Sequence, residues 1–445
     1  MSVLVRIAPS PTGLLHIGNI RAALFNYLFA RKLGGRFMLR LDDTDSTRSS
    51  AEYAQAIQRD LSWLGLTWDL FGRQSDRLAR YAEVLGELKN KGLVYPCYET
   101  QAELDLKRKT LLGRGLPPVY DRAALRLTDA DRAARDAQGI KPHWRFKLEH
   151  TETVWDDLIQ GPKSLPAASL SDPVLVRADG VPLYTFCSVV DDADDGTTHV
   201  IRGADHVTNT VVQIQLWQAV TSAPVPIFAH MPLLVSATGL EMSKRLGTLS
   251  IASMREEMGI EPMAINALLA KLGTSDPVAP RLSLDELVQE FDMARISHAT
   301  PKFDLEDLRS MNAKILHLTP FASVLDRLAA QGLESVDETF WKAVRANIEK
   351  IADVRNWQRI AQGDYSPVLT EPDFLKEAAA LLPLAPWDET TWGTWMDGVK
   401  ARTGRKGKEL FRPLRLALTG LDHGPEMKYF LPAMDRDRVL SVLEQ

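Results

Sequence analysis

Two hydrophobic patterns alternate along the first part of the chain. Val3 to Pro9 is a short apolar run, rich in β-branched residues, that ends at a loop of Pro, Ser and Gly, which predicts a buried strand. From Gly18 to Leu33 the apolar residues recur at helical spacing, and Gly34 and Gly35 end that pattern. Phe37 to Leu41 predicts a second strand, which runs into an acidic cluster.

A second helix is predicted to follow. Ser49 and Glu52 have the spacing of a capping box, and the apolar residues from Tyr53 to Leu64 lie on one helical face. Strand, helix, strand and helix in succession predict an α/β fold with a parallel sheet.

The middle of the chain departs from this alternation. Residues 92–173 show scattered charge and weak periodicity, which indicates an insertion into the core. Asp179 and Gly180 separate the apolar runs VLV and VPLYTF, a signal for a hairpin. Thr198 to Arg202 predicts a further strand, with a helix from about Thr208 to Val220.

The last third of the chain is predicted to be helical. The apolar residues between Trp341 and Trp357 recur every three or four positions, as on the buried face of one long helix. We therefore expect five parts: the first half of the core at 1–91, an insertion at 92–173, the second half of the core at 174–235, a region that opens with a basic loop at 236–300, and a helical region at 301–445.

Composition narrows the class of protein. A chain of 445 residues is expected to form two or three domains. Neither a signal peptide nor a membrane span is expected, and only two cysteines, Cys97 and Cys187, suit a reducing, cytoplasmic compartment. The net charge of -5 means that an RNA partner would have to be met by local basic patches.

The loop after the first strand is the strongest candidate for phosphate binding. It lies where open α/β sheets bind nucleotides, but it lacks both the dinucleotide-binding and the P-loop glycine patterns. His16 precedes Gly18 and Asn19 at the start of a helix, where phosphate is attracted and an imidazole can donate a hydrogen bond. Taken alone, His16 could equally be an ordinary polar loop residue.

A second candidate lies in SATGLEMSKRLG, residues 236–247. Ser243, Lys244 and Arg245 follow one another in a glycine-containing loop, and a lysine there is a suitable charge for a leaving pyrophosphate. Taken alone, such a basic turn is more often simply exposed.

Together, HIGN and MSKR resemble the two signature motifs of class I aminoacyl-tRNA synthetases. PSPTGLLHIGN, DDTD, VIRGADH, EMSKRLG and GKELFRPLRLALTGLDHGPEM, in this order over nearly the whole chain, are similar to the bacterial-type glutamyl-tRNA synthetases. The resemblance implies a Rossmann-like catalytic core with an inserted α+β acceptor-binding domain, a signature-loop and stem-contact region, and an all-α C-terminal anticodon-binding region.

The resemblance implies a two-step reaction. ATP and L-glutamate give glutamyl-adenylate and pyrophosphate, and the glutamyl group then moves to the 3′ end of tRNA. His16 and Lys244 are implied as catalytic, and both are also in the implied ATP-binding set: His16, Gly18, Asn19, Asp205, Ser243, Lys244 and Arg245. The implied glutamate-binding set is Arg6, Ala8, Ser10, Asp42, Tyr184 and Arg202. Mg²⁺ is expected on the nucleotide, without a protein cage.

Three positions depart from the family pattern. Asp42 stands where a glutamate usually holds the amino acid's ammonium group, and His206 stands where an aromatic residue is common. Cys97 lies where some relatives bind zinc, but because no second cysteine is near and His143 is distant in sequence, we predict no metal site and no zinc. An Arg202 ion pair with Asp205 and a solvated Asp42 are the alternatives to binding roles.

The RNA partner is expected at a basic stretch, residues 402–415. We predict that Arg402, Arg405, Lys406 and Arg412 bind tRNA(Glu), with tRNA(Gln) as a further possibility, and that the protein acts as a monomer away from membranes. Two other functions stay open: a glutaminyl-tRNA synthetase, or a variant that charges glutamine tRNA with glutamate, and a non-catalytic RNA-binding paralogue. Two arginines in the amino-acid pocket favour glutamate, because an unpaired buried guanidinium is costly.

Overall fold

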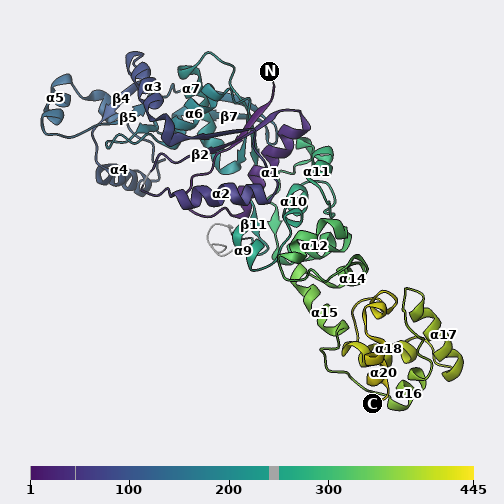
Figure 1. Cartoon of the computed structure of the whole chain (residues 1–445). Helices are drawn as coiled ribbons and strands as arrows, with labels where there is room; N and C mark the ends of the chain where they lie inside the picture. Colours follow the sequence, from purple (N-terminus) through teal and green to yellow (C-terminus); the bar gives the residue numbers. More distant parts are fainter. Residues whose placement is uncertain (1, 46, 240–249) are drawn as a thin grey trace. The chain divides into compact units, whose positions relative to one another are not determined.

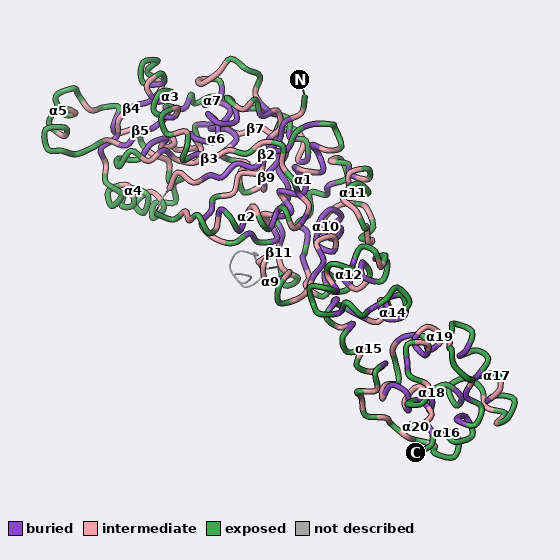
Figure 2. Tube along the Cα trace, viewed as in Figure 1, coloured by how far each residue is buried: buried purple, intermediate pink, exposed green. Residues whose placement is uncertain are grey.

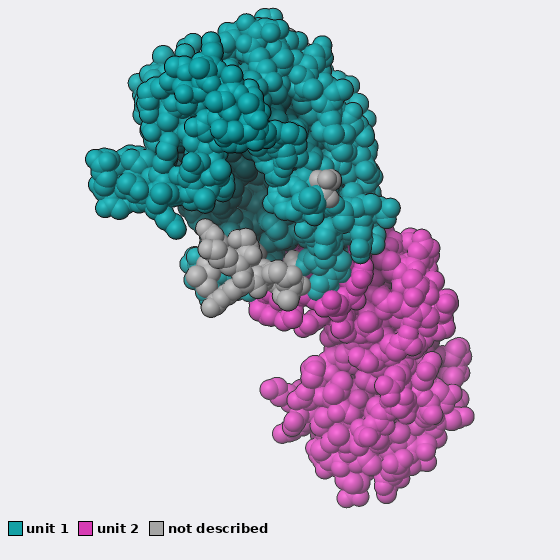
Figure 3. All heavy atoms as spheres, turned by 90° about the vertical axis from the view of Figure 1, so that its left-hand side faces the viewer, with its two compact units in different colours: residues 1–253, 266–279, 283–304 teal, residues 254–265, 280–282, 305–445 magenta. Residues whose placement is uncertain are grey.

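The computed structural model describes residues 2–45, 47–239 and 250–445. The chain forms two compact units, which are coloured separately in Figure 3. The first unit contains residues 1–253, 266–279 and 283–304, and the second contains residues 254–265, 280–282 and 305–445.

Parallel strands of two sheets form the centre of the first unit (Figure 1). One sheet contains β1 (Leu4–Ile7), β2 (Arg36–Leu41) and β3 (Leu70–Arg73), and the other includes β9 (His199–Gly203) and β10 (Ile227–Met231). β2 pairs in parallel with β1 and β3, and β10 pairs in parallel with β9. The Thr198 amide donates to the Leu4 carbonyl at 3.0 Å, so the chain entering β9 runs beside β1. The predicted α/β fold class is confirmed.

Helices that the periodicity predicted cover these strands. α1 (Ile17–Lys32) follows β1, α2 (Ala51–Trp63) follows β2, and α7 (Val207–Val220) follows β9. The side-chain NH₂ of Asn26 on α1 donates to the Ile201 carbonyl of β9 at 3.0 Å, which fixes the helix on the sheet. Figure 2 shows the strands β2 and β9 as largely buried.

The expected insertion contributes to two sheets. β4 (Val94–Cys97), β5 (His143–Phe146) and β8 (Val174–Val176) form an antiparallel sheet, so the strand that we placed at the return of the core pairs with β5 instead. β6 (Glu152–Asp157) and β7 (Gly161–Pro166) form a hairpin, and β6 pairs in parallel with β10 of the core. Pairing between strands far apart in sequence decides these assignments, which local patterns do not show.

The remaining helices and strands of the first unit include α6 (Tyr184–Asp195), which is largely buried. The others are α3 (Leu78–Asn90), α4 (Gln101–Gly113), α5 (Asp129–Ala137), α11 (Leu284–Glu290), β11 (Val235–Ser236) and β12 (Lys302–Phe303). The chain passes between the units within α9 (Ile251–Glu256) and α10 (Pro262–Lys271).

Two local predictions are wrong in detail. The residue that caps α2 is Ser50, whose hydroxyl accepts the Tyr53 amide at 3.1 Å, rather than Ser49. The turn at Asp179 and Gly180 forms, but the second apolar run makes only a bridge at Pro182 before it becomes the helix α6. The apolar residues of this run therefore face the core from a helix and not from a strand.

The second unit is helical, as predicted. Its helices beyond α9 and α10 are α12 (Leu305–Leu318), α13 (Leu325–Ala329), α14 (Glu338–Val344), α15 (Val354–Ala361), α16 (Pro372–Ala379), α17 (Thr391–Thr403), α18 (Lys408–Thr419), α19 (Met427–Phe430) and α20 (Arg436–Leu443). Trp341 and Trp395 are buried in its core, and their indole N–H groups donate to the carbonyls of Thr319 and Ala378.

The long helix predicted from Trp341 to Trp357 is not continuous. It ends near Val344 and resumes as α15, because Ile348 between them is extended. The Asp353 carboxylate accepts the amides of Glu349 and Lys350 at 3.0 Å each, which caps the short 3-10 turn Ile351–Asp353 that leads into α15. The apolar residues still face one core, so their spacing is helical although the backbone is interrupted.

Candidate active site

The predicted phosphate-facing loop connects β1 to α1. His16 is the N-cap of α1: its Nδ1 accepts the Gly18 amide at 3.1 Å, and its own amide donates to the Asn19 side chain at 3.2 Å. Since Nδ1 accepts, the proton of the neutral ring is on Nε2. Desolvation by the surrounding protein lowers the pKa of His16, which favours this neutral form. His16 is exposed and can therefore present an N–H donor to a ligand oxygen.

Gly18 lets the imidazole approach the helix. A Cβ at this position would lie 3.1 Å from both Cε1 and Nδ1 of His16, closer than ordinary side-chain contact. Any larger residue would displace the ring from the helix N-terminus, where the helix dipole favours an anion. The small residue at position 18 in the predicted phosphate-binding loop is thus explained by the close approach of the His16 ring.

Ser243, Lys244 and Arg245 lie outside the described residues, but the chain beyond them does not. Ser250 forms an antiparallel bridge with His16, and the Ile251 amide donates to the Leu15 carbonyl at 3.3 Å.

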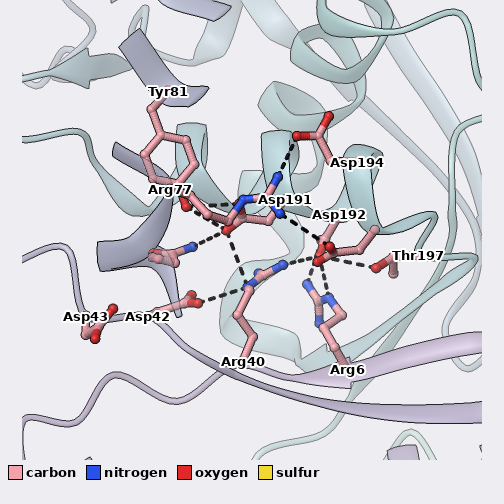
Figure 4. Close-up of polar contacts among 12 residues, drawn as sticks. Arg6, Arg40, Asp42, Asp43, Arg77, Tyr81, Asp191, Asp192, Asp194 and Thr197 are labelled. Atoms are coloured by element: carbon pink, nitrogen blue, oxygen red, sulfur yellow. Dashed lines mark hydrogen bonds and ion pairs between the residues drawn. The ribbon is translucent and has the colours of Figure 1, made fainter. Parts of the chain in front are cut away.

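A buried network of charges surrounds the end of β1 (Figure 4). The Arg6 guanidinium makes a two-point ion pair with Asp192 of α6, with both contacts at 3.0 Å. Arg40 donates to the same carboxylate at 2.7 Å and to Asp42 at 3.1 Å. Burial alone would lower the pKa of Arg40, but Asp192, Asp42 and Asp191 raise it well above its ordinary value. Arg40 therefore stays charged and holds the carboxylates of Asp42 and Asp192 in place.

Asp42 is buried and only half satisfied. Its Oδ1 accepts from Arg40, whereas Oδ2 has no hydrogen-bond partner in the described part of the chain. Burial raises the pKa of Asp42 to about 6, since the ion pair with Arg40 offsets only part of the desolvation. At pH 7 the group is therefore a carboxylate with one free oxygen, which suits an ammonium ligand. The Asp42 amide donates to Pro9 at 3.1 Å, so Asp42 also touches the loop after β1.

Arg202 occupies the end of β9 without a carboxylate partner among the described residues. Its Nε donates to His230 Nε2 at 3.1 Å, and its Nη2 donates to the Thr210 hydroxyl at 2.7 Å. Its Nη1 is buried and makes no hydrogen bond in the described structure. Desolvation lowers the Arg202 pKa, and the nearby Tyr184 offsets part of that effect. The alternative ion pair with Asp205 does not form: Asp205 lies 3.6 Å from His206 instead.

The other predicted pocket residues lie around these groups. Tyr184 is the first residue of α6. The centre of its ring lies 5.6 Å from the centre of the His206 ring, so the two rings are neighbours. Ala8 is half-buried and Ser10 is exposed in the loop after β1. Arg6 lies close enough to Asp42 and to Arg202 for its positive charge to lower the pKa of each.

Known proteins match this chain over nearly its whole length. The catalytic domain of class I tRNA synthetases (E and Q) matches residues 2–310, and an anticodon binding domain matches residues 368–445. The glutamate–tRNA ligase of Azospirillum brasilense is 60% identical, with 98% of each chain covered. The glutamate–tRNA ligase 2 of Methylorubrum populi is 56% identical and covers 98% of this chain and 97% of the relative. The chain belongs to the glutamate–tRNA ligase family of class I synthetases.

Solved members of the glutamate–tRNA ligase family share the fold. The glutamate-tRNA synthetase of Elizabethkingia anophelis superposes with a TM-score of 0.85 at 26% identity, covering 100% of this chain and 99% of that one. A glutamate tRNA ligase of Elizabethkingia meningosepticum, solved in complex with its amino acid, gives 0.83 at 26% identity, covering 100% and 98%. The chain is an aminoacyl-tRNA ligase of a family that uses ATP, as predicted.

Cys97 lies at the position where some family members bind zinc, but its thiol is buried and contacts a tyrosine hydroxyl. Burial raises the pKa of the Cys97 thiol to about 11, and Cys97 contacts the Tyr120 hydroxyl at 3.8 Å. His143, distant in sequence, lies opposite Cys97 on the neighbouring strand, so sequence distance was a poor guide. Within the described ranges, no group of three metal-binding side chains is found. The absence of zinc stays a prediction.

The predicted tRNA-binding residues lie in the second unit. Arg402, Lys406 and Arg412 are exposed on or between α17 and α18. Arg405 is engaged within the unit, because its guanidinium pairs with Glu371 and lies 4.0 Å from the centre of the Phe374 ring. In the described residues, no helix is both long and apolar enough to cross a membrane.

Sequence reasoning missed the residues that hold the pocket together. Arg40 and Asp192 support Arg6 and Asp42, and His230 supports Arg202. A signal existed for two of them: Asp192 belongs to an acidic run within an apolar helix, and His230 interrupts the apolar strand IFAHM. Charged or polar residues at such buried positions need partners, but the sequence alone does not name them.

Proposed function

We propose that the chain activates L-glutamate with ATP and transfers it to tRNA(Glu), with the predicted residues in the predicted roles. The observation that carries this proposal is that two of the predicted glutamate-binding residues each keep one buried polar atom without a partner in the described structure: Nη1 of Arg202 and Oδ2 of Asp42. A free guanidinium nitrogen suits a carboxylate, and a free carboxylate oxygen suits an ammonium group. Arg6, Tyr184, Ala8 and Ser10 complete the pocket for an amino acid with a second carboxylate.

Activation requires positioning and charge stabilisation rather than a protein nucleophile. A carboxylate oxygen of glutamate attacks the α-phosphate of ATP, and the bond to pyrophosphate breaks. His16, with Nε2–H free to donate, and the start of α1 at Gly18 and Asn19 face the phosphates, and Asp205 lies on the nucleotide side. Lys244, flanked by Ser243 and Arg245, meets the charge that develops on the leaving pyrophosphate. Mg²⁺ carried by the nucleotide would neutralise the remaining phosphate charge.

The parts of the chain divide this work. Residues 1–91 and 174–235 form the catalytic core, 92–173 bind the acceptor end, 236–300 carry the signature loop and contact the stem, and 301–445 bind the anticodon. The match of residues 368–445 to an anticodon binding domain supports the last assignment. Two free, buried cysteines suit a monomer in the reducing cytoplasm.

RNA binding in the second unit is supported by a hollow beside α18. Lys408, Phe411, Arg412 and Arg415 line it, which combines cationic side chains with an exposed aromatic ring. Single-stranded RNA loops are bound in this way, by stacking of bases on rings and by contacts to phosphates. We place Arg402, Lys406 and Arg412 at the phosphates, with Arg405 supporting them from its contact with Phe374.

ATP–pyrophosphate exchange with L-glutamate, in the presence of tRNA(Glu), tests the catalytic assignment. Lys244→Ala should lower the exchange rate by about a thousandfold and leave tRNA affinity within about twofold, because the lysine acts on charge formed in the transition state. Lys91→Ala, an exposed lysine of the first unit, is the matched control and should exchange normally. Equal losses of exchange and of tRNA affinity in Lys244→Ala would contradict the assignment.

A further inference from the structure

A row of three buried polar side chains crosses the sheet from β6 through β10 to β9. Asp157 ends β6, His230 lies on β10, and Arg202 lies opposite His230 on β9. Asp157 Oδ2 lies 2.5 Å from His230 Nδ1, and His230 Nε2 lies 3.1 Å from Arg202 Nε. The side chains of Asp157 and His230 are fully buried, and Arg202 is 6% exposed.

The proton positions in this row follow from Arg202. Its Nε always carries hydrogen, so His230 Nε2 must be the acceptor. The neutral ring then has its proton on Nδ1, which donates to Asp157. Burial lowers the pKa of His230, and hydrogen bonds from His230 and from backbone amides lower the pKa of the buried Asp157 to about 2 despite desolvation. The row is therefore a carboxylate, a neutral imidazole and a guanidinium.

Asp157 is itself fixed by the backbone. Its Oδ1 accepts the amides of Ile159 at 3.1 Å, Gln160 at 2.9 Å and His230 at 3.1 Å. Only an oxygen can occupy this position, so the second carboxylate oxygen has one orientation, toward His230. The tight turn between β6 and β7 thus determines which nitrogen of His230 carries the proton.

We propose that Asp157 and His230 are positioning residues that hold the Arg202 guanidinium with Nη1 directed at a carboxylate of the bound glutamate. This rests on the proposed role of Arg202 in glutamate binding. A row that ended in a second carboxylate beside Arg202 would neutralise it and compete with the ligand. A neutral imidazole holds the guanidinium in place and leaves its charge for the substrate. Thr210 braces the same guanidinium at Nη2.

Asp157→Asn tests the proton arrangement without removing volume. The three backbone amides hold the asparagine oxygen at the Oδ1 position, so its NH₂ group faces His230 Nδ1. The ring must then carry its proton on Nε2, where it opposes the N–H of Arg202. We expect the KM for glutamate in aminoacylation to rise roughly ten- to a hundredfold and the KM for ATP to stay nearly unchanged, while the melting temperature falls because two buried donors oppose each other.

Asp156→Asn is the matched control, because Asp156 is the exposed neighbour of Asp157 on β6. It makes the same chemical change outside the row and should leave the KM for glutamate unaltered. A folded Asp157→Asn protein with an unchanged KM for glutamate, or an equal rise in Asp156→Asn, would overturn the proposal.

Two His230 variants give an independent test if Asp157→Asn unfolds. The amide oxygen of His230→Gln can take the place of Nε2 and accept from Arg202, whereas the shorter His230→Asn reaches only toward Asp157. A positioning role predicts that the KM for glutamate is at least about fivefold higher in His230→Asn than in His230→Gln. Equal values of KM in the two variants, at equal melting temperatures, would show a merely structural role.

Arg202→Met separates this inference from the proposed function. If Arg202→Met raises the KM for glutamate but Asp157→Asn and the two His230 variants behave as wild type, the role of Arg202 stands and the positioning role is wrong. If Arg202→Met binds glutamate normally, the assignment of Arg202 itself is wrong, and the positioning role is overturned with it.

Discussion

The two arginines that we predict to bind glutamate are held in opposite ways. Arg6 is paired at two points with the buried carboxylate of Asp192, which also binds Arg40. Arg202 is held by uncharged groups, the imidazole of His230 and the hydroxyl of Thr210. Its positive charge therefore has no adjacent carboxylate among the described residues, whereas that of Arg6 does.

This difference indicates that one arginine holds the surrounding structure in place, whereas the other is available to bind a ligand. When one partner of a buried ion pair is removed, the other is left buried and uncompensated, which destabilises the fold whether or not the intact pair adds net stability. A buried charge without a counter-ion costs stability until a ligand supplies the opposite charge. We infer that Arg6 and its network shape the pocket, while Arg202 provides the strongest attraction for a carboxylate.

The largest expected effect comes from Arg202→Met, which removes the charge and keeps much of the side-chain length. We expect kcat/KM for glutamate in aminoacylation to fall by about a thousandfold, because a desolvated charge contact is lost. The melting temperature should not fall, since no ion pair is broken. A normal kcat/KM, or a large loss of stability, would contradict the claim that Arg202 binds the ligand whereas Arg6 holds the structure in place.

Arg6→Met should show the opposite balance. Removing the partner of Asp192 should cost about 3 kcal/mol in the free energy of unfolding, measured by urea denaturation at pH 7.5. Part of the activity should be lost as well, because the pocket changes shape. Stability equal to that of wild type would mean that Arg40 alone satisfies Asp192.

Because of Asp42, the KM for glutamate is expected to depend on pH. Its raised pKa of about 6 means that the carboxylate becomes protonated as the pH falls through 6, so the charge that would hold the ammonium group is lost. The KM for glutamate should rise about tenfold at pH 5 relative to its value at pH 8. In Asp42→Asn the KM should be high and should lack this rise.

The raised pKa of Asp42 also determines whether its contribution to the free energy of unfolding rises or falls with pH. Between about pH 4 and pH 6 the unfolded chain ionises Asp42 while the folded chain keeps the proton, so this group makes the fold less stable as the pH rises. Asp42→Asn should therefore gain stability relative to wild type between pH 4.5 and pH 7.5 in urea unfolding. A relative loss over that range would show that Asp42 is stabilised as a carboxylate.

The smallest effects are expected in the second unit. Lys406→Ala and Arg412→Ala should each weaken tRNA binding a few-fold and reduce the slope of log affinity against log salt by about one. Their KM for glutamate with saturating tRNA should stay at the wild-type value. Lys376→Ala, an exposed lysine of α16, is the control, and an equal effect there would mean that the basic stretch has no special role.

The sequence predicted those parts of the fold that depend on local pattern. β1, α1, β2 and α2 follow from hydrophobic spacing and glycine stops within about sixty residues. The break at Ile348 was missed because no glycine or proline marks it and the apolar spacing continues across it. The pairing of β8 with β5 was missed because it depends on partners outside the local pattern.

The site shows the same limit. Arg6, Asp42 and Arg202 could be named from motifs as a predicted glutamate site, and in the structure Asp42 and Arg202 are buried with one polar atom each that lacks a partner among the described residues. Their supports could not be paired from the sequence, because Arg40 lies 152 residues from Asp192 and His230 lies 73 residues from Asp157. Motifs identify groups that face a ligand, whereas supporting contacts depend on the fold.

Aminoacylation by the wild-type protein, with glutamate and glutamine compared on tRNA(Glu) and tRNA(Gln), tests the central claim most directly. An unpaired Arg202 predicts that kcat/KM for glutamate on tRNA(Glu) exceeds that for glutamine by about a thousandfold or more. Transfer of glutamate to tRNA(Gln) would widen the range of acceptors without changing this ratio. Charging with glutamine alone, or no turnover with any pair, would contradict the account.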